Sequence, residues 1–213
     1  MARIYLDYNA TAPLRPEARA AMIAAMDEIG NPSSVHQEGR AAKMIMERAR
    51  EQVAVALGAQ AADVVFTSGA TEAAALCLGG TDVHCSNIEH EAVSANCIVD
   101  QEVDDTGSVF VASPENSALQ LANSETGIIQ NLPNGLFASD MTQAFGKVPV
   151  AFDWSGAQMA MVSAHKLGGP KGVGALILKK GTHIAAQLRG GGQEMGRRSG
   201  TENIIGIAGF GAA

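Results

Sequence analysis

The sequence predicts an α/β fold, a three-layer sandwich in which helices cover both faces of a mostly parallel central sheet. Several short segments are apolar along their whole length, such as VVFT at 64–67, and this pattern is typical of strands buried on both faces. Alanine-rich helical segments separate these strands, and such alternation is typical of α/β proteins. The 213 residues are enough for one large domain or for two small ones.

The first predicted element is a helix over 16–28. Pro16 suits its opening turn, and Gly30 follows its end. The next segment, GNPSSVHQEGR at 30–40, is rich in turn-forming residues and is predicted as a loop.

The strongest helical pattern covers 41–57 and stops before Gly58. Met46 lies off the predicted apolar stripe. That stripe consists of Met44, Ile45, Val53 and Leu57.

Strands and helices are expected to alternate over the rest of the chain. Residues 71–78 are predicted as a helix, and 82–86, 91–99 and 108–112 continue the alternation. Further strand candidates are 118–123, 136–140, 159–165 and 173–181. Only the 12 residues 124–135 separate two of these strands, about the minimum for a crossover, so we expect a connection there without a helix.

Charge and composition exclude several classes of function. The net charge of −7 and the pI near 5.2 argue against a nucleic-acid-binding surface. No apolar run reaches the roughly 18 residues that span a bilayer, and no signal segment is recognisable, so we expect a cytoplasmic protein without membrane contact. Cys77, Cys85 and Cys97 do not form a disulfide framework or a C-x-x-C motif, and no H-x-x-x-H pair occurs, so no metal site is expected.

The segment FTSGATEAAALC is a candidate phosphate site. An apolar strand runs through Ser68, Gly69 and Ala70 into a helix that begins near Thr71. Small residues permit close approach of the backbone, and the free N–H groups of a helix start favour an anion. The alternative is an ordinary helix cap.

A second candidate is Asp140, at the end of a predicted strand. The carboxyl ends of strands in open α/β sheets are where ligands bind. Gln143, three residues later, could face the same site. Equally, Asp140 could cap the following turn.

The segment SAHKLGGPKGVGAL is a third candidate. Ser163, His165 and Lys166 follow a buried-looking strand, and a lysine held there could form a Schiff base with a carbonyl group. Without the other motifs, a solvated loop would explain the segment as well.

Two more features complete the set. GGGQEMGRRSGTEN at 190–203 is predicted as a mobile anion-binding loop, the alternative being an exposed basic turn. His90 could stack on a flat cofactor ring. Together, the motifs supply a phosphate cradle, an acid for a pyridine nitrogen, a stacking histidine and a Schiff-base lysine, the parts that a pyridoxal phosphate enzyme needs.

With these motifs the chain resembles the cysteine desulfurases, class V aminotransferase-like enzymes of fold type I. The matching segments occur in the family's order over nearly the whole chain. They are IYLDYNATAPLRPEA, GNPSSVHQEGR, VVFTSGATEAAAL, IEHEAV, LANSETGIIQ, SDMTQAFGKVPV, SAHKLGGPKGVGAL and GGGQEMGRRSGTEN.

The resemblance implies a role for each candidate residue. Lys166 would bind the cofactor as a Schiff base, Asp140 would pair with the pyridine nitrogen, and His90 would stack on the ring and shuttle protons. Gln143 and Ser124 would lie near the ring hydroxyl. The phosphate would be held by Ala70, Thr71, Ser163 and His165, with Thr201 contributed by a neighbouring subunit. The resemblance further implies a homodimer, L-cysteine as substrate, L-alanine as product, and a sulfur-acceptor protein of iron–sulfur cluster assembly.

The sequence departs from the family pattern in three ways. Ser124 stands where the family has an asparagine, although Asn123 precedes it, and the stretches between motifs are short. We expect 1–213 to be a single large domain, with an N-terminal arm and helix at 1–30 and a sheet core at 31–213. The family's small C-terminal domain and its loop cysteine are expected to be absent.

These departures keep alternatives open. One is a catalytically inactive homologue that binds pyridoxal phosphate or dimerises, and another is a different class V lyase or transaminase. Release of free sulfide, or a selenocysteine lyase-type reaction, without a persulfide is a further possibility. The three cysteines are expected to be small buried apolar residues.

Overall fold

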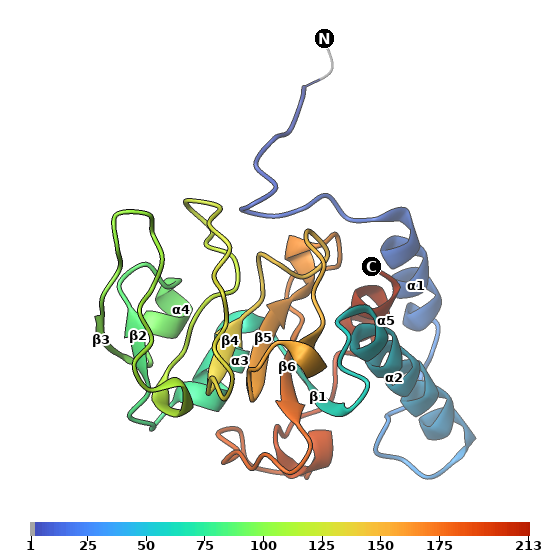
Figure 1. Cartoon of the computed structure of the whole chain (residues 1–213). Coiled ribbons are helices and arrows are strands. Elements are labelled where there is room, and N and C mark those ends of the chain that lie inside the picture. The colour runs from blue at the N-terminus through green and yellow to red at the C-terminus, as the bar shows by residue number, and fades with distance from the viewer. Residues whose placement is uncertain (1–2) are drawn as a thin grey trace.

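A four-stranded sheet occupies the middle of the computed structural model, which describes residues 3–213 (Figure 1). Its strands lie in the order β1 (Ala62–Thr67), β6 (Gly174–Lys179), β5 (Met159–Ser163) and β4 (Ala138–Asp140). A second sheet contains β2 (His84–Ser86) and β3 (Ile98–Gln101). Parallel bridges from β2 to Ser117 and from Ala118 to β4 connect the two sheets through the extended segment 117–121.

The predicted mostly parallel arrangement is correct except at β6. β4 pairs in parallel with β5, and β2 with β3, whereas β6 runs antiparallel to both of its neighbours. Only residues 164–173 connect β5 to β6, too few for a crossover helix. The chain therefore reverses there, and a parallel β6 is excluded.

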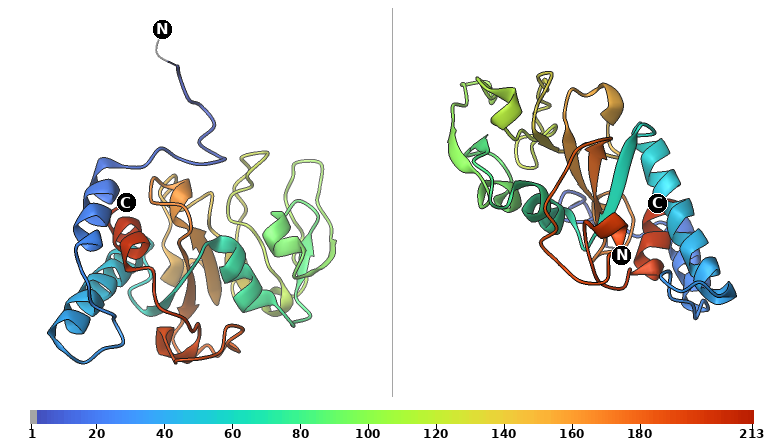
Figure 2. Two further views of the ribbon diagram at one scale, coloured as in Figure 1. Left: turned by 180° about the vertical axis from the view of Figure 1, so that it is seen from behind. Right: turned by 90° about the horizontal axis from the view of Figure 1, so that it is seen from below.

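Helices cover both faces of the sheet, as the predicted three-layer sandwich requires (Figures 1 and 2). One layer contains α1 (Pro16–Met26), α2 (Gln37–Ala56) and α5 (Ile204–Ala212), and the other contains α3 (Ala70–Leu78) and α4 (Glu91–Ser94). Short 3₁₀ helices occupy Pro114–Asn116, Phe152–Trp154, Ala164–Lys166 and Glu194–Gly196. Among the described residues, no helix combines the length and apolarity needed to cross a bilayer.

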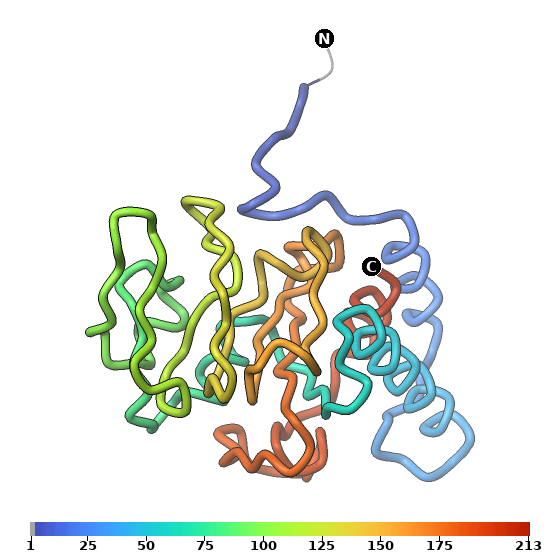
Figure 3. The backbone as a smooth tube through the Cα atoms, in the orientation of Figure 1, coloured from blue at the N-terminus to red at the C-terminus, as the bar shows by residue number. Residues whose placement is uncertain are grey.

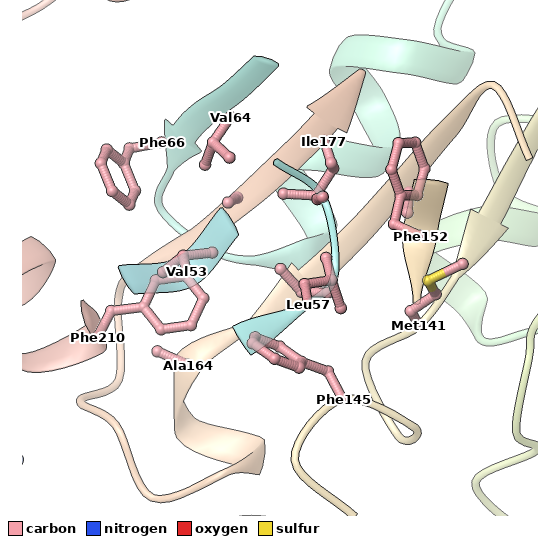
Figure 4. Close-up of a cluster of buried hydrophobic side chains, with 14 of the residues drawn as sticks. Val53, Leu57, Val64, Phe66, Met141, Phe145, Phe152, Ala164, Ile177 and Phe210 are labelled. Carbon is pink, nitrogen blue, oxygen red and sulfur yellow. The ribbon is translucent and has the colours of Figure 1, made fainter. Parts of the chain in front are cut away.

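Alternate side chains of each central strand belong to two different cores. In β5, Ala160 and Val162 pack with α2 and α5, whereas Met159 and Met161 pack with α3. Figure 4 shows the first core, in which Phe210 of α5 lies near strand and helix side chains. Strands that bury both faces must be apolar at every position, which explains the continuous apolar runs in the sequence.

The second helix differs from its prediction in length and in its buried face. α2 begins at Gln37, inside the predicted loop, because His36 Nδ1 accepts the Gly39 N–H at 3.3 Å and caps the helix. Met46 is 5% exposed and Met44 is 70% exposed, so the predicted stripe was wrong at these two positions. The buried stripe is Gly39, Ala42, Met46, Ala49 and Val53.

Close packing against α5 selects this face of α2. A Cβ atom added to Gly211 of α5 would lie 2.7 Å from the Ala49 Cα atom, so the two helices approach almost backbone to backbone. Only small side chains permit that distance, and the alanines of α2 therefore face inward while Met44 turns to solvent.

Several other predicted elements are shorter than expected or absent as regular elements. The predicted strands 108–112 and 118–123 are extended segments that form only isolated bridges, and 91–99 divides between α4 and the start of β3. Residues 124–135 contain no helix, which confirms the predicted short connection.

Candidate functional site

A pocket of about 670 Å³ lies at the strand ends and includes Ala10 and Thr11 in its lining. These two residues belong to the N-terminal segment, whose course before α1 can be followed in Figure 3. Nine of the ten residues proposed from sequence line this pocket. They are Ala70, Thr71, His90, Ser124, Asp140, Gln143, Ser163, His165 and Lys166. The exception is Thr201, which lines a separate cavity of about 90 Å³ together with Arg198.

The turn from β1 into α3 forms one wall of the pocket. Gly69 is the N-cap of α3, so the first N–H groups of the helix have no partner within the helix. A Cβ atom on Gly69 would lie 3.8 Å from Ser163 Oγ, in the space between the helix start and β5. The turn is close-packed from behind, because a Cβ atom on Gly174 would lie 2.7 Å from the Gly69 Cα atom. The result is an open cradle of N–H and hydroxyl donors suited to an anion.

Asp140 ends β4 on the opposite side of the pocket. Its Oδ1 atom accepts the Thr142 N–H at 2.8 Å. Burial raises the pKa of the Asp140 carboxyl, while the hydrogen bonds of Thr142 and the positive charges of His90 and Lys166 act in the opposite direction. A cationic N–H group in the pocket would therefore favour the ionised form of Asp140.

His90 is oriented by the helix that follows it. It is the N-cap of α4, and its Nδ1 atom accepts the Ala92 N–H at 3.1 Å. In the neutral ring the proton is then on Nε2, which is the donor that His90 can present to a ligand.

Lys166 lies in the 3₁₀ turn that follows β5. Its Nζ atom donates to the Asn9 carbonyl oxygen at 2.6 Å, and Gln143 Nε2 donates to the same oxygen at 3.0 Å. The Asn9 side chain donates in turn to the Ser124 carbonyl oxygen at 2.9 Å. Asn9 thus connects three of the predicted residues. Sequence reasoning missed this role because no local pattern marks a residue whose partners are more than 100 positions away.

His165 is held by the same N-terminal segment. Its Nδ1 atom lies 3.2 Å from Thr11 Oγ1. Burial lowers the pKa of His165, and the nearby charges of Lys166, Lys171 and Lys147 lower it further. His165 is therefore neutral at pH 7, and the positive charge at this wall comes from lysines.

The neighbouring residues Asn123 and Ser124 differ in their contacts. Ser124 lines the pocket, and its hydroxyl lies 3.1 Å from Glu125 Oε1. The Asn123 side chain donates to the Ile88 carbonyl oxygen and accepts the N–H groups of the following turn. These contacts fix the orientation of the Asn123 amide, and Asn123 also lines the pocket.

The loop at 190–203, which the sequence predicts as a mobile anion-binding loop, contains two arginines that contact acids on other elements. Arg197 forms an ion pair with Asp63 at 2.8 Å, and Arg198 pairs with Glu72 at 2.7 Å. Both guanidinium groups therefore already have carboxylate partners. These acids lie on β1 and α3, far from the arginines in sequence, and anion binding by the loop stays a prediction.

A buried ion pair fastens the same loop to α2 and β1. Arg50 contacts both carboxylate oxygens of Glu194, at 2.8 and 2.9 Å, and Glu194 also accepts the Phe66 N–H at 2.8 Å. The Arg50 guanidinium lies 4.9 Å from the centre of the Phe66 ring. Glu194 and Met195 have φ values of 50° and 60°, a left-handed conformation that is unfavourable for side-chain-bearing residues. The ion pair holds the loop in this conformation.

Replacing Arg50 with methionine should lower the free energy of unfolding by about 3 kcal/mol, because Glu194 would remain buried without its cation. Denaturant unfolding measures this loss. The control is Arg48→Met, an exposed position on the same helix, where we expect a change below about 0.5 kcal/mol. A second substitution, Glu194→Gln, should recover part of the loss in the Arg50→Met background. An equal loss of unfolding free energy in Arg50→Met and Arg48→Met would contradict a stabilising role of the Arg50–Glu194 pair.

The Glu72–Arg198 pair predicts a specific pH dependence of stability. Partial burial would raise the pKa of Glu72, but hydrogen bonds from Arg198 and the Ser68 N–H outweigh it, so this pKa lies below 4.5. A lowered pKa stabilises the fold above the unfolded value, and this stabilisation is lost as the pH falls through the folded value. The difference in unfolding free energy between wild type and Glu72→Gln should therefore be about 1 kcal/mol near neutral pH, begin to shrink as the pH approaches 4.5, and vanish only below the lowered pKa of Glu72 in the folded state. A difference that persists unchanged in acid would contradict this.

The three cysteines lie outside the pocket lining. Cys77 and Cys85 are buried, and Cys97 is half-buried beside Cys85. Burial raises the pKa of Cys77 to about 12, and the hydrogen bond with Cys97 together with burial raises the pKa of Cys85. Both buried thiols are therefore protonated at neutral pH and act as small apolar residues.

Comparison with known proteins identifies related sequences and structures. The profile of the family described as aminotransferase class V matches residues 4–114 and 78–213. A cysteine desulfurase of Frankia sp. (strain EuIK1) is 39% identical over 257 residues, covering 99% of this chain and 61% of the relative. A cysteine desulfurase IscS of Dictyoglomus turgidum is 38% identical over 246 residues, covering 99% of this chain and 62% of the relative.

These alignments are longer than the chain itself, so connections between matching segments are shorter here. The chain spans about three fifths of the length of these curated relatives.

Solved structures show the same similarity. A NifS-like protein from Rickettsia africae superposes with a TM-score of 0.88 at 35% identity, covering 99% of this chain and 67% of that protein. A structure described as SspA in complex with cysteine superposes with a TM-score of 0.87 at 28% identity, covering 98% of this chain and 71% of that protein.

Proposed function

Because the chain belongs to the class V aminotransferase family and, within it, to the cysteine desulfurases, we propose that it provides the pyridoxal phosphate site of an enzyme that converts L-cysteine to L-alanine with transfer of sulfur. The observation that carries this proposal is the pocket in which nine residues, named from five separate motifs, come together. The substrate is further supported by the structural relative described in complex with cysteine.

The residues present fit pyridoxal phosphate. The cradle at Gly69 has donors for a phosphate group, because the first N–H groups of α3 have no partner within the helix and the Ser163 hydroxyl lies nearby. Asp140 offers a half-buried carboxylate, and no described residue donates to its Oδ2 atom. Lys166 offers a primary amine in the same pocket. Ala70, Thr71, Ser163 and His165 would hold the phosphate, and Ser124 and Gln143 would lie near the ring hydroxyl.

When bound, the cofactor would supply an aldehyde for an amine and an electron-withdrawing ring. The protein's own groups would do the rest. The Asp140 carboxylate would hold a proton on the pyridine nitrogen, and the Lys166 amine, released from the Asn9 carbonyl oxygen, would take and return protons. His90 would donate from Nε2, because its Nδ1 atom is occupied by the Ala92 N–H.

The wider setting belongs to the same proposal. We propose a cytoplasmic homodimer in which Thr201 contributes to the phosphate site of the neighbouring subunit. Its position outside its own pocket, on a loop fastened to β1 and α3, supports this role. The sulfur would pass to an acceptor protein of iron–sulfur cluster assembly.

Titration of the purified chain with pyridoxal phosphate, followed by addition of L-cysteine, tests the proposal. The expected results are a visible absorption band of the bound cofactor and the formation of alanine and sulfide. No absorption band would overturn the cofactor site. A band without alanine would leave a cofactor-binding protein and overturn turnover by this chain, an outcome to which the burial of Cys77 and Cys85 would contribute.

A further inference from the structure

Glu89 is a buried acid that the proposed chemistry does not use. It directly precedes His90, is 7% exposed, and takes part in no ion pair of the described chain. Its Oε1 atom accepts the Gln120 N–H at 2.7 Å. With its amide nitrogen turned toward the same carboxyl group, the Gln120 side chain also donates to Oε2 at 2.7 Å. One residue thus binds Glu89 through both its backbone and its side chain.

A second polar contact joins the same two segments. Asn123 Nδ2 donates to the Ile88 carbonyl oxygen at 2.8 Å. The turn at 88–90 is therefore attached at two points to segment 118–123. That segment is attached in turn to β4, through the Leu121 N–H to the Asp140 carbonyl oxygen at 2.9 Å and through Ser139 Oγ to the Leu119 carbonyl oxygen at 2.8 Å.

An acid is a costly choice for this position. Burial raises the pKa of Glu89 well above its usual value, Asp140 of β4 and Cys85 of β2 raise it further, and only the Gln120 N–H acts in the opposite direction. A buried ionisable group contributes less to stability than an apolar residue of similar volume. Its presence is therefore better explained by its contacts with segment 118–123, which place the turn carrying His90, than by stability.

We infer that Glu89 is a positioning residue, whose carboxyl group clamps the turn carrying His90 to segment 118–123 and so sets where His90 lies relative to Asp140 across the pocket. The hydrogen bonds of Glu89 and Asn123 do not depend on any cofactor, whereas the expected effect on cofactor binding rests on the proposed function. Loss of the clamp would free the His90 ring without removing any group that touches the cofactor.

The experiment compares four proteins reconstituted with pyridoxal phosphate: wild type, Glu89→Ala, Glu89→Gln and Glu91→Ala. Visible circular dichroism reports the orientation of the bound ring, and titration gives its dissociation constant. Glu89→Ala should bind about tenfold more weakly, with an altered dichroic band. Glu89→Gln keeps an oxygen acceptor for the Gln120 N–H and should stay within about twofold of wild type. Glu91 is exposed on the other side of His90, so Glu91→Ala should match wild type.

Wild-type affinity and dichroism in Glu89→Ala would overturn the inference. Equal loss in Glu89→Gln and Glu89→Ala would also overturn it, because the charge rather than the clamp would then matter. If Glu89→Ala does not fold, Glu89→Leu fills the same volume without an acceptor and should show the same weakened binding at undiminished thermal stability.

A measurement without cofactor separates this inference from the proposed function. In ¹⁵N NMR spectra of the cofactor-free protein, His90 should be the Nε2–H tautomer in wild type and Glu89→Gln, and a mixture of tautomers in Glu89→Ala. If wild type binds no pyridoxal phosphate, the proposed function fails, and this spectrum still decides the role of Glu89. An unchanged tautomer in Glu89→Ala would overturn the clamp.

Discussion

Replacement of Lys166 by alanine is expected to abolish the visible absorption band of bound pyridoxal phosphate and to reduce alanine formation from cysteine by at least about 10³-fold. Lys166 is the amine that the strand end at Ser163 brings into the pocket, where its Nζ atom is hydrogen-bonded to the Asn9 carbonyl oxygen. The other nearby lysines differ in placement. Lys171 is exposed at the pocket edge, and Lys147 contacts Gln143 and does not line the pocket.

The measurement is an absorption spectrum of each protein after removal of free cofactor. Borohydride reduction followed by peptide mass analysis then identifies the lysine that carries the cofactor. Lys180→Ala serves as the control, because Lys180 is exposed beyond the end of β6 and should leave both band and rate unchanged. A wild-type band in Lys166→Ala, or a cofactor mass on a different lysine, would refute the assignment.

Replacement of Asp140 by asparagine should reduce the rate of alanine formation by about 10²- to 10³-fold, because the amide has no negative charge to hold a proton on the pyridine nitrogen. The free energy of unfolding of the cofactor-free protein should instead increase. Burial raises the pKa of Asp140, so its ionised form destabilises the cofactor-free fold at neutral pH. The asparagine side chain keeps an oxygen acceptor for the Thr142 N–H without that charge.

The pH dependence of stability distinguishes this effect from a general loss of folding. The gain of Asp140→Asn over wild type should be greatest above the raised folded pKa and should disappear as the pH falls below the unfolded value of 3.8, where the wild-type carboxyl is protonated in both states. Denaturant unfolding at several pH values measures it, with Asp105→Asn as an exposed control. A less stable Asp140→Asn protein would show that the Asp140 carboxylate stabilises the fold. An undiminished rate of alanine formation would show that its charge is not needed by the cofactor.

The helices and most of the central strands were predictable because their signals are local. Pro16 marks the start of α1, and the continuous apolar runs mark β1, β5 and β6. The direction of β6 was not predicted, although it follows from the short connection after Ser163. The buried face of α2 was assigned wrongly at Met44, because the close approach of Gly211 to Ala49 decides that face and no periodicity of α2 reveals it.

The residues that line the pocket were also predictable from sequence, because each motif carries its own signature. By itself, the sequence determined which residue types could hold a cofactor and, through the order of the motifs, which family they resemble. Only the tertiary structure decided that nine of those residues share one pocket, that Arg197 and Arg198 are paired with acids, and that Asn9 is hydrogen-bonded to Lys166 and Glu89 to Gln120. The physical reason is that a motif is encoded in neighbouring residues, whereas these contacts join segments between 31 and 157 positions apart, whose proximity depends on how the strands and layers pack.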